Sequence, residues 1–333
     1  MRSLFLLLLL LFPSCGDQDF HLRPNVSPYE GDDGGIEGAG GVTGRICAPN
    51  GDFVIGAEVW VDHAHGRTET TTDTDGAFEL APIPPGPQTV HARRGSFTAT
   101  FQVEIVADMM VALEEGACLS DLSLAVAVGH YDDIEGVLGD LGFAYTLLDG
   151  PWDPFELMTT PEVIAQYDIV FFNCGMNTSH VTDAAVTTLR EYVEGGGSIY
   201  ASDRAYWVIE RAFPDLIDFV GDDTIEGDAR VGAQTSSPLE AQVYDPIFAA
   251  ALGGSTAQIS FDQPDWVAVQ AAADPDWVLV AATFPLVTGG NLHGPLAVRA
   301  PVGEGTVLYT AFHNADQTTA DVQVLLREIV LGL

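Results

Sequence analysis

The feature that most constrains the fold is a change of pattern near residue 119. From about residue 42, short runs of alternating apolar residues are separated by turns rich in Gly, Pro, Asn and Asp. Beyond residue 119, apolar runs of strand length alternate with segments of helical period. The first pattern predicts short antiparallel strands, and the second predicts a parallel sheet covered by helices. The chain is therefore expected to be multidomain, with a small antiparallel β-sandwich (42–118) followed by an α/β doubly wound domain (119–333).

The α/β part is predicted from buried strands and the helices between them. Near-continuous apolar runs at 122–128, 168–172, 198–202 and 306–312 indicate strands buried on both faces. Segments with helical spacing include 132–141, 182–194 and 318–331. The stretch 220–295 is less regular and is predicted to be a β-rich insertion. Sheets of this kind bind ligands outside the carboxyl ends of their strands, so a site is expected there.

Composition excludes one class of function. The 333 residues include 48 acidic and 12 basic side chains, for a net charge of -36, and Lys is absent. A field of that sign repels nucleic acid, so DNA and RNA are not expected as partners. Because 47% of residues are hydrophobic, the charge does not indicate disorder.

The first 41 residues predict export and attachment. One positive charge precedes an apolar run at 4–12, which is short for a membrane span but typical of a secretory signal. Phe12-Pro13-Ser14-Cys15 resembles a lipobox, although Phe12 and Pro13 depart from its usual residues. The resemblance implies a signal peptide at 1–14, lipid on Cys15, and an acidic, Gly-rich tether at 15–41. The protein is then a membrane-anchored lipoprotein of the cell envelope; the alternatives are simple secretion and a cytoplasmic protein.

The remaining three cysteines are expected to behave differently. Cys47 and Cys118 lie near the two ends of the sandwich, and an oxidising compartment favours a disulfide between them. The alternative is two separate buried thiols. Cys174 would remain free. His63 and His65 lie two residues apart without an evident third ligand, which favours a loop pair over a zinc site.

The sandwich carries motifs of a known family. Gly44-Arg45-Ile46, Thr72-Asp73-Thr74-Asp75-Gly76-Ala77-Phe78 and Ile83-Pro84-Pro85-Gly86 resemble a carboxypeptidase regulatory-like domain. That resemblance implies a transthyretin-like sandwich, related to carbohydrate-binding-like folds, with a structural or binding role and no chemistry of its own. Trp60 is the evident platform on which a sugar could stack.

The second part resembles another family. Its motifs are Tyr167 to Gly175 (YDIVFFNCG), Gly196 to Asp203 (GGSIYASD) and Gly305 to Asn314 (GTVLYTAFHN). They are similar to the class I glutamine amidotransferase-like fold, in its trehalose-utilisation-type branch, which implies a flavodoxin-like sheet. In active members a cysteine occupies the sharp turn after the fourth strand, and a histidine with an acid follows the last. The matching positions here are Asp203 and His313, so the nucleophile is missing, and Asp316 matches the acid only loosely.

Two functional hypotheses follow. The first is a non-catalytic envelope lipoprotein with a binding or scaffolding role, which requires no cofactor or metal and has an envelope protein or a carbohydrate as partner. The second is a hydrolase-like enzyme that uses Asp203, His313 and Cys174 at the carboxyl edge of the sheet. Carbohydrate binding through the sandwich is compatible with both. We predict that Asp203 and His313 lie within side-chain reach of each other. An open cleft at these residues would favour the enzyme, whereas an edge of the sheet filled by other residues would favour the non-catalytic protein.

Overall fold

The computed structural model describes residues 25–29, 31, 35–113, 116–120, 122–313 and 319–333. The predicted signal peptide and Cys15 lie outside these residues, as does Asp316. Among the helices that are described, none is both long enough and apolar enough to cross a membrane.

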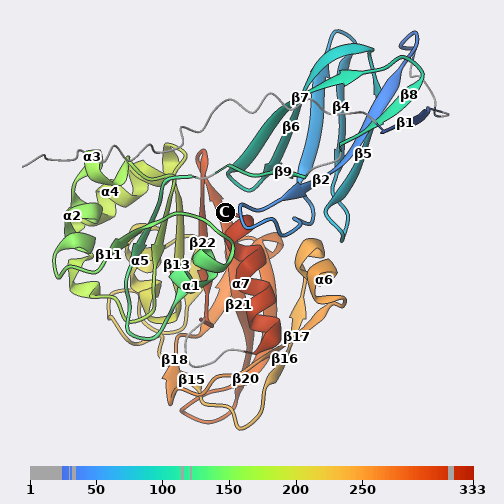
Figure 1. Cartoon of the computed structure of the whole chain (residues 1–333). Coiled ribbons are helices and arrows are strands. Elements are labelled where there is room, and N and C mark those ends of the chain that lie inside the picture. Colours follow the sequence, from blue (N-terminus) through green and yellow to red (C-terminus); the bar gives the residue numbers. More distant parts are fainter. Residues whose placement is uncertain (1–24, 30, 32–34, 114–115, 121, 314–318) are drawn as a thin grey trace, which may run out of the picture.

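The N-terminal part is a β-sandwich of two sheets (Figure 1). One sheet has the order β1-β8-β2-β5, with β9 also paired to β2, and the other has the order β4-β3-β6-β7. The strands are β1 Asn25–Pro28, β2 Gly40–Cys47, β3 Glu58–His63, β4 Gly66–Thr71, β5 Ala77–Ile83, β6 Gly86–Arg94, β7 Phe97–Ile105, β8 Met109–Ala112 and β9 Ala117–Cys118. Buried and more exposed residues alternate along the strands, as in β3, where Val59 and Val61 are buried while Glu58 and Asp62 are exposed and Trp60 is half-buried.

The predicted tether 15–41 is wrong from Asn25 onward, in the part that the structure describes. β1 lies inside it and pairs antiparallel with β8 from Asn25↔Ala112 to Pro28↔Met109. Ile36 and Ala39 are buried, and β2 already begins at Gly40. Strand pairing is made by backbone groups, so a segment without an apolar period can still join a sheet edge.

The second part is built on a nine-stranded sheet with the order β11-β10-β12-β13-β22-β21-β20-β16-β17. Its first five strands are parallel, and in chain order they read 2-1-3-4-5, the flavodoxin-like arrangement. The predicted fold class is therefore confirmed. These strands are β10 Leu124–Ala127, β11 Thr146–Leu148, β12 Ile169–Phe172, β13 Ser198–Ser202 and β22 Gly305–Thr310. All four residues of β10 and of β12 are buried, which explains their continuous apolar sequence.

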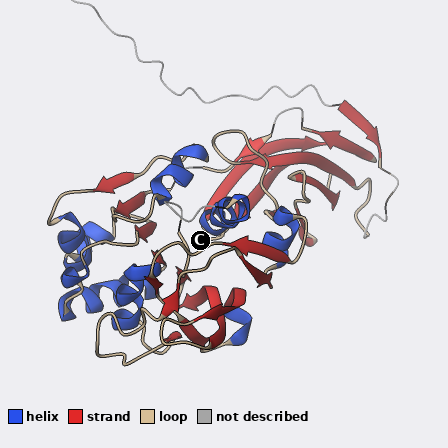
Figure 2. Ribbon diagram, turned by 90° about the horizontal axis from the view of Figure 1, so that it is seen from below, coloured by secondary structure: helices blue, strands red, loops and turns tan. Residues whose placement is uncertain are grey.

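Helices form two groups beside this sheet (Figures 1 and 2). In one group α2 and α5 pack on α4, and in the other α1 and α6 pack on α7. The helices are α1 Ile134–Asp140, α2 Asp153–Thr159, α3 Pro161–Ile164, α4 Asp183–Glu194, α5 Tyr206–Ala212, α6 Pro246–Leu252 and α7 Ala320–Leu331. The sequence did not predict α2 or α6, because neither segment shows a clear helical period. α6 is fixed by its cap, where Asp245 accepts from the amides of Ile247 and Phe248.

The predicted β-rich insertion is present, and part of it extends the main sheet. β20, β16 and β17 continue the sheet beyond β22 through the long strand β21, and all these pairs are antiparallel. Two small two-stranded sheets, β14 with β19 and β15 with β18, complete it. The strands are β14 Ile217–Phe219, β15 Gly232–Ala233, β16 Leu239–Val243, β17 Thr256–Ile259, β18 Asp265–Trp266, β19 Val269–Ala272, β20 Val278–Pro285 and β21 Asn291–Val302.

One hydrophobic core runs through both parts of the molecule. Phe97 of the sandwich contacts Phe143 of the α/β part, with ring centroids 4.4 Å apart. The amide of Ser96 donates to the carbonyl of Leu333, and Gly95 beside it has a left-handed φ of 59° that favours glycine. The C-terminal residue described thus packs against the turn between β6 and β7.

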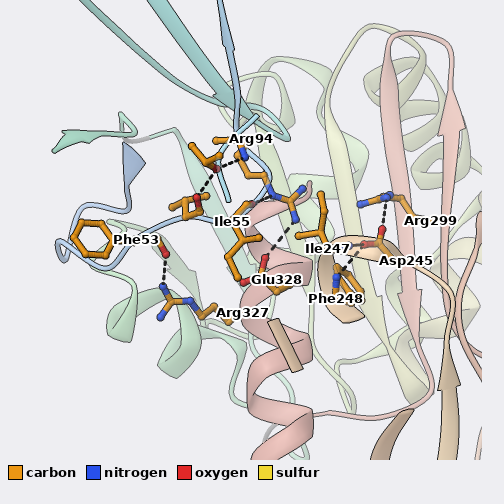
Figure 3. Close-up of polar contacts among 12 residues, drawn as sticks. Phe53, Ile55, Arg94, Asp245, Ile247, Phe248, Arg299, Arg327 and Glu328 are labelled. Atoms are coloured by element: carbon orange, nitrogen blue, oxygen red, sulfur yellow. Dashed lines mark hydrogen bonds and ion pairs between the residues drawn. The ribbon is translucent and has the colours of Figure 1, made fainter. Parts of the chain in front are cut away.

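A buried ion pair also joins the two parts (Figure 3). The guanidinium of Arg94 on β6 lies 3.4 Å from the carboxylate of Glu328 on α7, and both side chains are at most 6% exposed. Arg94 also donates to the carbonyl of Ile55 at 3.2 Å. In a more exposed part of the same contact, Arg327 forms an ion pair with Asp52 at 2.7 Å. A buried charge that loses its partner is costly, so this contact ties the positions of the two parts together.

Candidate functional site

Three chemically active side chains meet at the carboxyl edge of the parallel strands. Cys174 follows the end of β12, Asp203 comes directly after β13, and His313 follows the end of β22. Because these strands are parallel neighbours, their ends lie side by side. The thiol, one carboxylate oxygen and one imidazole nitrogen all lie within 4.8 Å of one another. The structure thus brings together the three residues that the sequence singled out, and whether they act chemically stays a prediction.

Asp203 occupies a sharp turn between strand and helix. Its backbone φ is 39°, in the left-handed region that residues other than glycine rarely adopt. Its Oδ1 accepts a hydrogen bond from the backbone amide of Val267 at 2.7 Å, and its Oδ2 accepts one from the thiol of Cys174 at 3.3 Å. Tyr309 donates to the Asp203 carbonyl at 3.3 Å. Both carboxylate oxygens are therefore engaged within the protein.

A second acid belongs to the same network. The amide of Cys174 donates to Ser202 Oγ at 2.9 Å, and Ser202 Oγ donates to a carboxylate oxygen of Asp132. Asp132 is 6% exposed and follows β10, the strand beside β12. Asp132 was not predicted as a site residue, although it follows a buried strand at the same edge of the sheet as Cys174.

Burial sets the chemistry of the cluster. Cys174, Asp203 and His313 are each 1% exposed. Burial raises the pKa of the Cys174 thiol far above its usual range, and the nearby Asp203 raises it further. Burial also raises the pKa of Asp203, opposed by the attraction of His313 and the amide of Val267. The thiol is therefore protonated, and it is not the thiolate that a cysteine nucleophile requires.

The predicted disulfide of the sandwich is confirmed. Cys47 and Cys118 are bridged, with Cα atoms 4.2 Å apart and a sequence separation of 71 residues. The bridge joins the end of β2 to β9, which pairs with it. Cys174 is a free, buried cysteine.

The sandwich also carries a polar hollow of about 770 Å³ between β2, β5 and β4. Its lining combines the aromatic rings of Phe53 and Phe78 with hydrogen-bonding side chains of both charge signs, among them Arg45, Asp73 and Glu79. This hollow was not predictable from the sequence, since it combines residues from three strands and three loops.

Trp60 is less suited to stack on a sugar than the sequence suggested. Its ring stacks on His91 of β6, with centroids 5.3 Å apart. The guanidinium of Arg67 on β4 lies 5.1 Å from the same ring. These two neighbours come from the strands on either side of β3, and they leave less of the half-buried ring available to a ligand.

Comparisons with known proteins bear on the two parts separately. The family model of the carboxypeptidase regulatory-like domain matches residues 41–113, which confirms that resemblance for the sandwich. No curated protein matches the chain. Among solved structures, a putative ThuA-like protein from Bacteroides uniformis is 14% identical, with 63% of this chain and 90% of that chain covered and a TM-score of 0.41. A putative ThuA-like protein from Parabacteroides merdae is 13% identical, with 63% and 88% covered and a TM-score of 0.38. These scores are low, so the fold class rests on the strand order above.

Proposed function

We propose that the chain is a non-catalytic cell-envelope lipoprotein with a binding or scaffolding role, whose α/β part is a degenerate amidotransferase-like fold. One observation carries the proposal. The left-handed turn after β13 keeps the geometry of a nucleophile position, but it holds Asp203, a buried carboxyl with both oxygens engaged. A reactive group needs access to its substrate, and 1% exposure gives it none.

The competing proposal is a hydrolase that uses Asp203, His313 and Cys174. It would need an ionised nucleophile in an open cleft with donors aimed at the developing charge. The two acidic groups of this cluster, Cys174 and Asp203, both have a raised pKa, which disfavours their charged forms.

A hydrolysis assay separates these two proposals. The full-length protein is incubated with glutamine and with an activated ester, and released ammonia or phenolate is measured for the wild type, Asp203→Ala, His313→Ala and Asp203→Cys. We expect no rate above buffer for any of them, because a cysteine placed in the turn is still covered. A wild-type rate that His313→Ala abolishes would establish the hydrolase.

Attachment through Cys15 is tested by metabolic labelling with palmitate. The wild-type protein should carry label and fractionate with membranes, whereas Cys15→Ser should carry none. Cys174→Ser is the matched control and should be labelled like the wild type. Equal labelling of Cys15→Ser would reject the anchor.

The hollow on the sandwich favours carbohydrate as the ligand class for the binding role. Its carboxylates, Arg45 and threonine hydroxyls can exchange hydrogen bonds with a polyol. Phe53 is 43% exposed and offers apolar surface, although the guanidinium of Arg45 lies 4.5 Å from the centre of its ring. Binding to a glycan array should be lost in Arg45→Ala and Phe53→Ala. Arg67→Ala, on the other sheet, should keep it; loss in that variant instead would place binding elsewhere.

A further inference from the structure

The cluster of Cys174, Asp203 and His313 offers three kinds of metal ligand at one point. A thiol sulfur, a carboxylate oxygen and an imidazole nitrogen lie within 4.8 Å of one another, each on a side chain 1% exposed. No other group of three or more such residues is found among the described residues. Sulfur, nitrogen and oxygen donors together suit a borderline metal such as zinc, whereas calcium and magnesium take oxygen ligands.

The spacing is close to that of zinc ligands. Zinc binds sulfur at about 2.3 Å and carboxylate oxygen at about 2.0 Å in a tetrahedral arrangement, so the two ligand atoms lie about 3.5 Å apart. The measured separation between Cys174 Sγ and Asp203 Oδ2 is 3.3 Å. An imidazole nitrogen of His313 lies within 4.8 Å of the Cys174 sulfur and of a carboxylate oxygen of Asp203.

Charge balance points the same way. A thiolate, a carboxylate and a neutral imidazole carry two negative charges together, which a divalent cation neutralises. Buried charges are tolerated when they are paired or bind a metal. The excess of acidic side chains, with a net charge of -36, favours divalent cations over anions at any site in this protein.

We propose that Cys174, Asp203 and His313 form a buried site that holds one zinc ion through three protein ligands and ties the ends of β12, β13 and β22 together, with a water molecule as the fourth ligand of the tetrahedron. Binding forms one bond from zinc to each of the sulfur, an oxygen of Asp203 and an imidazole nitrogen, and the thiol proton is released to solvent. The hydrogen bond from the thiol to Asp203 is replaced by the shared metal. The site goes beyond the non-catalytic role proposed above and does not depend on the ligand of the sandwich.

The test uses the full-length protein and zinc alone. The protein is stripped with a chelator, incubated with zinc chloride, dialysed and analysed for metal by mass spectrometry. We expect about one zinc per chain and a raised Tm. Cys174→Ser, Asp203→Asn and His313→Gln should each reduce the retained zinc at least tenfold. The control is the double variant His63→Ala/His65→Ala, which removes the histidine pair of the sandwich and should retain zinc like the wild type.

Cobalt provides a second measurement that does not need a folded variant. In the wild-type protein, cobalt bound through Cys174 should give a thiolate-to-cobalt charge-transfer band in the near ultraviolet, which zinc should then displace. The proposal would be overturned if the variant His63→Ala/His65→Ala no longer retained zinc. It would also be overturned if the wild type bound one cobalt ion per chain without showing the thiolate band. A wild-type protein that retains no zinc would also overturn the proposal.

Discussion

The two parts of the molecule hold their cysteines in opposite ways. In the sandwich, Cys47 and Cys118 close a covalent bridge between β2 and β9. In the α/β part, Cys174 is free and buried, and it donates to Asp203 beside His313. A small domain has little core and gains most from a bridge, whereas a large sheet can position a thiol by strand ends alone. The sandwich is therefore stabilised by a covalent bridge, whereas the residues at the edge of the α/β sheet are held in position by hydrogen bonds.

The largest expected effect comes from breaking the contact that joins the two parts. Glu328→Ala leaves the buried guanidinium of Arg94 without its carboxylate and should lower the free energy of unfolding by about 3–5 kcal/mol, measured by urea denaturation. Asp62→Ala, which removes the partner of the exposed Arg67, is the control and should change nothing measurable. Equal effects from the two variants would mean that the interface pair does not couple the parts.

Removing the bridge of the sandwich should have the next largest effect. The double variant Cys47→Ala/Cys118→Ala should lose about 2–5 kcal/mol, because the unfolded chain is no longer constrained across the 71-residue separation. Urea denaturation with and without reductant measures it: reductant should destabilise the wild type and leave the variant unchanged. A wild type that is insensitive to reductant in urea would contradict the stabilising role of the bridge.

Replacing the free cysteine should cost less than removing the bridge. Cys174→Ala removes a small buried side chain and its hydrogen bond to Asp203, and should lower the free energy of unfolding by about 0.5–3 kcal/mol in metal-free protein. Cys174→Ser keeps a donor and should lose less. A loss as large as that of the double variant would remove the contrast between the two parts.

The smallest effect on the free energy of unfolding is expected at Glu210, another buried acid of the α/β part. Burial, and then repulsion from Asp223, raises the pKa of Glu210 to about 7 from its usual value of 4.5. The folded protein therefore holds a proton that the unfolded chain releases. The associated stability is present below about pH 4.5 and is lost as pH rises through about 7.

Glu210→Gln should remove this part of the pH dependence. Between pH 5 and 7 the wild type should lose on the order of 1–2 kcal/mol more than the variant, in chemical denaturation followed by fluorescence. Glu240→Gln, on an exposed position of β16, is the control and should follow the wild type. Parallel pH curves for Glu210→Gln and the wild type would show that Glu210 is solvated.

The sequence predicted the sandwich well because its information is local. Turns such as Asp73 to Gly76 punctuate the strands, and Asp73 accepts from the amides of Asp75 and Ala77 as such a turn requires. β1 was missed because edge pairing uses backbone groups. In the α/β part, the buried strands and the order of the site residues after them were predictable, since parallel strand ends share one edge.

The burial of the site residues could not be predicted from the sequence. Nothing in the residues around Asp203 predicts that the amide of Val267, 64 positions later, occupies its Oδ1. That contact depends on how the insertion packs over the edge of the sheet. The involvement of Asp132 depends likewise on Ser202, from a different strand.

Alkylation of Cys174 tests whether the cluster at the edge of the sheet is closed to reagents in the folded protein. The folded full-length protein is treated with iodoacetamide at neutral pH, and the peptide that contains Cys174 is quantified by mass spectrometry. The buried Cys174 sulfur, protonated in metal-free protein or bound to zinc, should remain unmodified while the protein is folded and react once the protein is denatured in urea with a chelator present. Modification in the folded protein at the rate seen in urea would contradict the account, because it would reveal an accessible thiolate at the edge of the sheet.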